Sequence, residues 1–239
     1  MLGSRSTTMQ IECLYEDDEL FVLNKPSGLV VHRGWATAEV ALVDFARDRT
    51  KDGAAHPIQR LDRSASGAVL FAKTGALAQS LSELAQAGHC RKDYLAIVRG
   101  ETPEELDIDH PISRREDGPR VAARTLVQRL ALAPTQPRHV SLVSVTPITG
   151  RLHQIRRHLK HANYPLIGDV NYGHGDLNRA FRTRYGLVRL ALHVYRWTIE
   201  RTGSKGSVSG TVPLPDDLSE PMVAMGFKLG AERLPLGLA

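Results

Sequence analysis

Asp62 stands between two arginines, Arg60 and Arg63, in the segment HPIQRLDRSASGAVLFAKT that spans residues 56–74. Neighbouring guanidinium groups favour the ionised form of a carboxyl group, so Asp62 is expected to carry a negative charge. One interpretation is an ion pair at the entrance to a strand, which is the commoner arrangement. The other is a nucleophile for an anionic substrate. No second acid lies close by, which disfavours the paired-carboxylate hydrolysis of glycosidases.

The segment TGRLHQIRRHLKHANYPLIGDVNYG, residues 149–173, carries the strongest local pattern. As a helix over Leu152–Ala162 it has an apolar stripe and a basic stripe, the latter made of His153, Arg156, Arg157 and Lys160. Three arginines and three histidines lie within eleven residues with no acid among them. A solvated helix face usually mixes in glutamates. The pattern therefore predicts phosphate binding, with Thr149 and Gly150 preceding the helix at an expected anion site.

Three further segments hold polar residues with more than one interpretation. In RKDYLAIVRG, Tyr94 is either a strand aromatic in the core or a stacking wall for a base. In NKPSGLVVHRG, Lys25 and Arg33 flank a Pro-Ser-Gly turn, which by itself indicates a surface turn. His193 lies on an alternating strand pattern and is interpreted as a packed or hydrogen-bonded histidine.

The composition favours a polyanionic partner, and the residues disfavour a bound metal. The 239 residues carry a formal charge of +5. The positive charge around the three histidines disfavours a bound cation, and Cys13 and Cys90 form no CxxC pair. Their separation also fits a reducing compartment, and no apolar run approaches the ~18 residues of a membrane span. We therefore expect a cytoplasmic enzyme or binding protein.

Short strand-like segments outnumber helical ones and do not alternate with them regularly, which favours an α+β fold with a mixed or antiparallel sheet. The expected strands are 20–23, 68–72, 94–98, 140–145 and the run 188–199, and the expected helices are 40–47, 77–87 and 152–162. Residues 10–217 are expected to form one domain. Residues 1–9 are expected to be a flexible N-terminus and residues 218–239 a C-terminal tail.

Four separated segments, taken together, resemble RluA-type pseudouridine synthases. They are NKPSGLVVHRG, the RLD of QRLDRSASG, RKDYLAIVRG, and TGRLHQIRRHL with PLIGDVNYG, in the order and spacing of that family. The segments VHRGW and GDLNRAFRTRYGLVRLALH are most similar to members that act on uridine in tRNA. Many relatives carry an N-terminal S4-like RNA-binding domain, and none is expected here because the first motif begins within the first 25 residues.

The resemblance implies the pseudouridine synthase fold, with a mixed, mainly antiparallel sheet and flanking helices and loops around a central RNA-binding cleft. It also implies a reaction that detaches uracil at N1 and rejoins it through C5, without metal or cofactor. Asp62 matches the catalytic aspartate, which attacks the sugar C1′ or otherwise assists cleavage. Tyr94 matches the tyrosine that stacks on the base and is a candidate for removing the C5 proton. Arg156 matches the arginine that pairs with the aspartate.

The remaining implied contacts are with RNA. A uridine buried in a helix must be flipped out at a cost of a few kcal/mol, and Arg60 matches the residue that can fill the space it leaves. Six further residues are candidates for substrate binding, mainly through phosphates: Lys25, Arg63, Arg151, His153, Arg157 and Lys160.

Two residues depart from the family pattern beside the aspartate. Gln59 replaces the usual histidine and Ala65 the usual threonine, while Asp62, Tyr94 and Arg156 are all present, so activity is expected. The alternatives are an rRNA substrate, or a catalytically weak RNA-binding or RNA-folding protein on the same scaffold. A hydrolase with Asp62 as nucleophile would leave the basic helix unused. The simplest expectation for the oligomeric state is a monomer.

Overall fold

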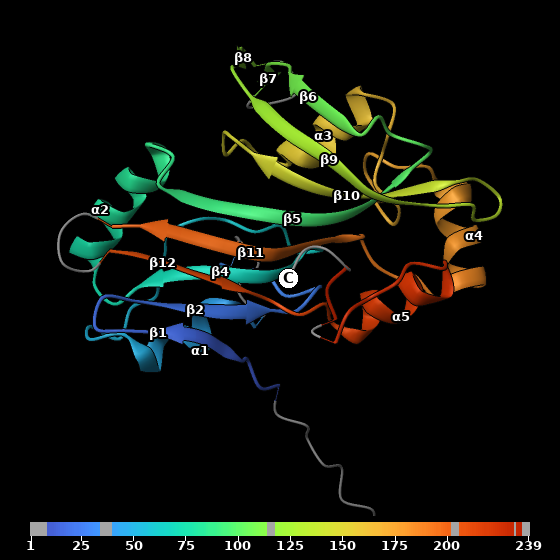
Figure 1. Ribbon diagram of the computed structural model, residues 1–239. Helices are drawn as coiled ribbons and strands as arrows, with labels where there is room; N and C mark the ends of the chain where they lie inside the picture. The colour runs from blue at the N-terminus through green and yellow to red at the C-terminus, as the bar shows by residue number, and fades with distance from the viewer. Residues whose placement is uncertain (1–8, 34–39, 114–117, 202–205, 232, 236–239) are drawn as a thin grey trace, which may run out of the picture.

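A ten-stranded sheet forms the body of the protein (Figure 1). The computed structural model describes residues 9–33, 40–113, 118–201, 206–231 and 233–235. The strand order is β1-β2-β4-β11-β5-β10-β9-β6, with β3 added to β4 and β12 to β11. Among the described strands, β11 and β4 pair in parallel and the other pairings are antiparallel. A separate hairpin of β7 and β8 lies beside β6.

The strand bounds are β1 Cys13–Glu16, β2 Leu20–Lys25, β3 His56–Pro57, β4 Ser66–Ala72, β5 Cys90–Arg99, β6 Glu105–Asp109, β7 Ile112–Ser113, β8 Arg120–Val121, β9 Arg124–Ala133, β10 Val140–Pro147, β11 Leu192–Glu200 and β12 Ser207–Thr211. The helices are α1 Leu42–Ala46, the 3-10 turn η1 Arg47–Arg49, α2 Gly75–Gln86, α3 Gln154–His161, α4 Gly175–Tyr185 and α5 Asp216–Ala224. The α+β class expected from the sequence is confirmed.

The central strands bury apolar residues on both faces, and each face has its own core. Along β5, Tyr94, Ala96 and Val98 belong to one cluster, which also contains residues of α1, α2 and α3. Leu95 and Ile97 belong to the other, which contains residues of α4 and α5. The alternation follows from the two-residue period of a strand. Helices α4 and α5 therefore cover the face of β5 opposite to that of Tyr94 (Figure 1).

The expected C-terminal tail is wrong for the residues that the structure describes. The expected boundary after residue 217 falls inside α5, and Leu218, Met222, Phe227 and Leu234 are buried in the second core. These apolar side chains have a core to fill, so the segment folds back onto the domain. Residues 1–9 were expected to be flexible, and positions 1–8 of that range lie outside the described residues. None of the helices described is long and apolar enough to cross a membrane.

Two glycines allow the close backbone contacts that bring the site together. Gly67 has φ +108°, and a Cβ there would lie 2.2 Å from the carbonyl oxygen of Val194. Gly168 has φ +78°, and a Cβ there would lie 1.9 Å from the carbonyl oxygen of Arg189. Both positions therefore require glycine on conformational and steric grounds. Gly67 is the second residue of β4, five positions after Asp62, and Gly168 immediately precedes Asp169.

Candidate active site

Asp62 lies on the loop between β3 and β4 and is held by a helix residue 94 positions further along the chain. Nη1 of Arg156, in α3, donates to Oδ2 of Asp62 at 3.1 Å. The Asp62 side chain remains 23% exposed, whereas that of Arg156 is 6% exposed. Nε2 of His153 lies 3.9 Å from the same Oδ2. The structure thus brings together the aspartate and the arginine that the resemblance paired.

A second carboxylate, Asp169, fixes Arg156 from behind. Nε and Nη2 of Arg156 donate to the two Asp169 oxygens at 2.7 and 2.8 Å, a two-pronged contact that leaves Nη1 for Asp62. Oδ1 of Asp169 also accepts from the backbone amides of Asn171 and Tyr172. Burial alone would raise the pKa of Asp169, but the Arg156 guanidinium and these amides outweigh it, so this pKa is lowered. Both carboxylates raise the pKa of Arg156 against the opposing effect of burial.

His153 and Tyr172 complete the shell around Arg156. The backbone of His153 is left-handed, with φ 52°, at the point where the chain enters α3. Its Nδ1 is 3.1 Å from the Tyr172 hydroxyl, and the Tyr172 ring lies 5.0 Å from the Arg156 guanidinium carbon. Burial lowers the pKa of His153, and the nearby arginines act in the same direction, although the Asp62 charge opposes them. His153 is thus a neutral ring beside the Asp62 carboxylate near pH 7.

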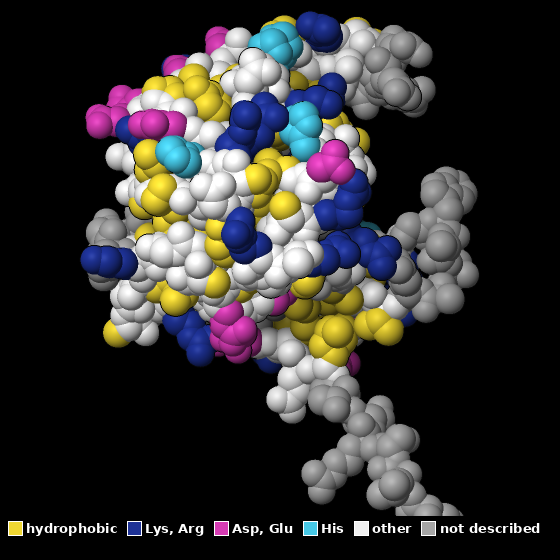
Figure 2. All heavy atoms as spheres, turned by 90° about the vertical axis from the view of Figure 1, so that its right-hand side faces the viewer, with side chains coloured by type: hydrophobic (Ala, Val, Ile, Leu, Met, Phe, Trp, Pro, Cys, Tyr) yellow, Lys and Arg dark blue, Asp and Glu magenta, His cyan; other side chains and the backbone are white. Residues whose placement is uncertain are grey.

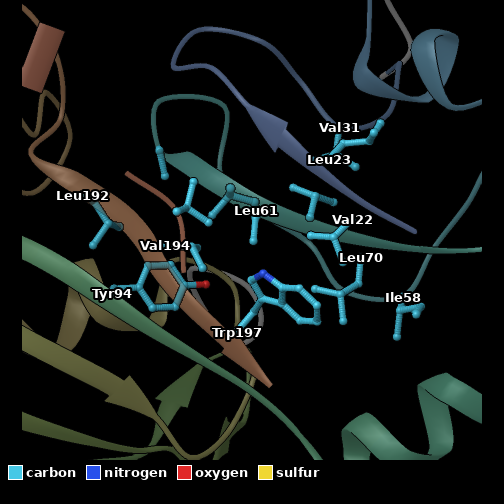
Figure 3. Packing of buried hydrophobic residues seen from close by; sticks show 14 of the residues in the cluster. Val22, Leu23, Val31, Ile58, Leu61, Leu70, Tyr94, Leu192, Val194 and Trp197 are labelled. Atoms are coloured by element: carbon cyan, nitrogen blue, oxygen red, sulfur yellow. The ribbon is translucent and has the colours of Figure 1, made fainter. Parts of the chain in front are cut away.

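Tyr94 lies on β5 at the inner side of the site and is 9% exposed. Figure 3 shows its ring beside Val194 of β11, with Leu61 and Trp197 nearby in the same core. Burial raises the pKa of the Tyr94 hydroxyl well above its ordinary value, and the Asp62 charge raises it further. The core interpretation of Tyr94 is confirmed, since its side chain packs in the first cluster, and the ring is close enough to Asp62 for the Asp62 charge to act on it. The stacking interpretation stays a prediction.

Lys25 has an interior position, which corrects its expected contact with RNA phosphate. The side chain is fully buried. Its Nζ lies within hydrogen-bond distance, 2.6–3.1 Å, of four backbone carbonyls, those of Pro26, Leu29, Arg63 and Ala65, and its N–H groups are shared among them. Burial lowers the pKa of Lys25 to about 7, with Arg189 as a further cause. Lys25 thereby links the turn after β2 to the loop that carries Asp62. We interpret it as a structural support of that loop.

A buried polar network anchors the start of β4 behind the Asp62 loop. The Ser66 hydroxyl lies 2.8 Å from Nδ1 of His193 and accepts from Nη2 of Arg189 at 2.7 Å. Arg189 also donates to Asp217 in α5. The expectation that His193 is a hydrogen-bonded strand residue is confirmed, since it is fully buried and also within 3.2 Å of the Val212 carbonyl. Burial lowers its pKa to about 3.

The other basic candidates lie around this centre at differing exposure. Arg60 and Lys160 are exposed. Arg63 donates to the Gly28 carbonyl. Arg151 donates to the Ala122 carbonyl, and Arg157 donates to both the carbonyl and the hydroxyl of Ser113 in β7. The expected basic stripe of α3 is wrong in one respect. The Arg156 side chain is buried and not on the exposed side of the helix, because it pairs with the buried Asp169.

The residues at the two departures from the family pattern both have structural contacts. Nε2 of Gln59 donates to the Cys90 carbonyl at 3.2 Å, on the β5 side of the loop. Ala65 is fully buried, and its carbonyl accepts the shortest of the Lys25 hydrogen bonds. The Ala65 amide donates to the Asp62 backbone carbonyl at 3.1 Å. Among the hydrogen bonds of the described residues, the Gln59 side chain makes none with Asp62.

Sequence reasoning missed Asp169, Tyr172 and the Arg189 network. The signal for Asp169 was present, since it is the one acid in the segment 149–173 that carries so many cations. For Arg189 the partners are Ser66 and Asp217, more than 25 residues away in either direction, and no local spacing reveals them. The described residues contain no group of three or more metal-ligating side chains.

Comparison with known proteins defines the class. A family model described as RNA pseudouridylate synthase matches residues 19–161. The tRNA pseudouridine synthase C of Haemophilus ducreyi is 37% identical over 222 residues, which cover 84% of this chain and 90% of the relative. That of Pasteurella multocida is 36% identical and covers 79% and 85%. The ribosomal large subunit pseudouridine synthase C of Yersinia pestis is 32% identical and covers 89% and 68%.

Solved structures agree on the fold. Human RNA Pseudouridylate Synthase Domain Containing 4 superposes with a TM-score of 0.73 at 24% identity, covering 91% of this chain and 94% of that one. Human RNA Pseudouridylate Synthase Domain Containing 1 gives a TM-score of 0.71 at 24% identity, covering 87% and 86%. The chain therefore belongs to the RNA pseudouridylate synthase family. Its activity is the isomerisation of uridine to pseudouridine in RNA.

Proposed function

We propose that the protein converts a specific uridine of tRNA to pseudouridine, with Asp62 as the residue that acts on the sugar. The observation that carries this proposal is the state of the Asp62 carboxylate. Its Oδ2 is held by Arg156, while the described residues form no hydrogen bond to Oδ1. One oxygen thus fixes the orientation of the carboxylate and the other is available for attack at C1′.

The residues around Asp62 have complementary roles in this reaction. Asp62 displaces N1 from C1′ and forms an ester there, and the freed base turns. C5 then displaces the Asp62 carboxylate from C1′, the C5 proton is released to solvent and N1 takes up a proton. Arg156 holds the Asp62 carboxylate in place through the hydrogen bond to Oδ2. Tyr94 supports the face of the base by stacking, since burial and the Asp62 charge disfavour the phenolate needed to remove the C5 proton. His153, neutral beside Asp62, is a binding residue at the same edge.

The basic residues outside this centre bind the RNA that surrounds the target. Arg60 is exposed next to Asp62 in sequence and can fill the space left by a flipped uridine. Arg63, Arg151, Arg157 and Lys160 contact phosphates or riboses, which positions the RNA without selecting its sequence. The enzyme acts in the cytoplasm, in line with its two free cysteines. It acts as a monomer.

The choice of tRNA rests on the relatives that cover most of both chains. Two relatives at 36–37% identity are tRNA pseudouridine synthases C. The 32% identical relative from Yersinia pestis is a ribosomal large subunit enzyme, and this chain spans 68% of its length. An rRNA substrate is therefore the second candidate.

The test measures tritium release from RNA labelled at uridine C5. Wild-type protein, Asp62→Asn and Asp62→Ala are incubated in parallel with tRNA and with rRNA from cells that lack the gene. We expect release from tRNA with wild type and none with either variant. Release from rRNA alone would transfer the proposal to the ribosome. Binding without release from either RNA would indicate an RNA-binding protein, and free uracil would indicate a hydrolase.

A further inference from the structure

Helix α4 carries exposed arginines that the chemistry at Asp62 does not use. It buries Phe181 and packs Leu177 and Tyr185 against the second core, so its other side faces outward. Arg179, Arg182 and Arg184 are all exposed there. Arg179 pairs with Asp176, whereas no carboxylate among the described residues pairs with Arg182 or Arg184.

The turn between β9 and β10 extends this basic surface. The backbone amide of Gln136 donates to the Tyr185 hydroxyl at 2.9 Å, which docks the turn on the end of α4. Arg138 and His139 follow it and are exposed, and Arg138 has no ion-pair partner in the described chain. Gln136, Pro137, Arg179, Ala180, Thr183 and Arg184 line an open hollow of about 410 Å³ between turn and helix.

The distribution of charge on this side of the molecule is uneven. Figure 2 shows lysine, arginine and histidine side chains spread over the middle and upper part of the face, with most acidic ones at its upper left and lower edges. Arg184 lines the hollow, and the exposed Arg138 and Arg182 are each next in the chain to a residue that lines it. Exposed arginines beside a concave surface favour a polyanion, and the guanidinium fork matches phosphate geometry.

This surface is joined to the active site but faces another direction. The Asn178 side chain in α4 accepts from the Gly168 amide and donates to the Asp169 carbonyl. From Asn178 the helix continues to Tyr185, about 10 Å further, on the face of the sheet opposite to Tyr94. An RNA that reaches both places must extend well beyond the target nucleotide.

We propose that Arg138, Arg182 and Arg184 form a second RNA-binding surface, which holds the phosphate backbone of the substrate tRNA at a distance from the modified uridine. The inference rests on the proposed function, because the occupant is a part of the same RNA. A large folded RNA gains affinity from this surface, and an isolated stem-loop that fits only the active site does not.

The test compares two double variants that each remove two exposed positive charges. Arg182→Ala/Arg184→Ala alters the surface, and Arg47→Ala/Lys51→Ala alters the opposite end of the molecule near α1. Binding of tRNA from cells lacking the gene, and of a single tRNA stem-loop containing the target, is measured over a salt series. The lysine variant Arg182→Lys/Arg184→Lys retains the charge and tests whether charge alone suffices.

We expect Arg182→Ala/Arg184→Ala to lower the log–log salt slope for whole tRNA by about 2, because two phosphate contacts are lost. Adding Arg138→Ala lowers it by about one more. The slope for the stem-loop, kcat at saturating tRNA, and the control variant stay unchanged, and the lysine variant retains most of the slope. Equal slopes for the surface and control variants would overturn the inference, as would an equal loss for the stem-loop. Failure of wild type to release tritium would instead contradict the proposed function.

Discussion

The two carboxylates that share Arg156 have opposite environments. Asp169 is completely buried and accepts four hydrogen bonds, two from Arg156 and two from backbone amides. The Asp62 side chain is partly exposed, and its carboxylate accepts one hydrogen bond from the part of the chain that the structure describes, also from Arg156. The buried carboxylate has its hydrogen bonds filled and positions the guanidinium, whereas the described residues form no hydrogen bond to one oxygen of the exposed carboxylate. Under the proposed function, positioning and reactivity are divided between two acids that share one cation.

The variant Asp62→Asn gives the sharpest test of this difference between the two carboxylates, because it retains the shape of the side chain and removes its charge. We expect kcat to fall by ~10⁴-fold or more, as for an essential nucleophile. The free energy of unfolding should change by less than about 1 kcal/mol, because Arg156 keeps its buried partner. Tritium release and urea denaturation measure the two quantities. A large loss of stability would mean that Asp62 is chiefly a structural acid.

Asp169→Asn should give the reverse pattern. Removing one partner of a buried ion pair costs about 3–5 kcal/mol, and the free energy of unfolding should fall by that order. At a temperature where the variant is folded, kcat should fall by about 10²-fold, because the Arg156 guanidinium is no longer held in the orientation that positions Asp62. If stability fell and kcat stayed at the wild-type value, Arg156 would not need Asp169 for its orientation.

Lys25→Met tests the support beneath the Asp62 loop. It leaves four carbonyls without their buried donor, so the free energy of unfolding at pH 7 should fall by about 1–3 kcal/mol. The folded pKa of Lys25 is about 7 and the ordinary value is 10.5. Between these values the unfolded chain binds more protons than the folded one, so wild-type stability rises with pH relative to Lys25→Met.

Urea denaturation of both proteins at pH 7, 8.5 and 10 measures this difference. The stability advantage of wild type should increase across the series and should diminish as the pH falls through about 7. A constant difference would show that Lys25 keeps its ordinary pKa in the folded protein.

Tyr172→Phe is expected to have the smallest effect. It keeps the ring over Arg156 and removes the hydroxyl that lies 3.1 Å from Nδ1 of His153. The loss of one hydrogen bond corresponds to about 0.5–1.5 kcal/mol, or roughly a 3- to 10-fold decrease in kcat/KM. His153→Ala in the Tyr172→Phe background should add little more, because both changes act on one contact. Additive effects would place the two residues in separate roles.

Local sequence patterns predicted the elements whose stability depends on their own apolar residues. The strands β2, β4, β5 and β10 were identified from runs of aliphatic and aromatic residues, and α3 from its period, although it begins two residues later than expected. Helices α4 and α5 were missed. Within α4 Phe181 alone is buried, and α5 contains Pro221, so both depend on packing against the second core.

The sequence by itself determined the order of the motifs and with it the candidate site residues, because Asp62, Tyr94 and Arg156 each stand in a recognisable local context. Only the tertiary structure decided which charges meet. Arg156 turned inward to Asp169, and Lys25, expected at the surface, became a buried clamp. The reason is physical: an ionic side chain can enter the interior only where the fold supplies its partners, and these come from segments far apart in the chain.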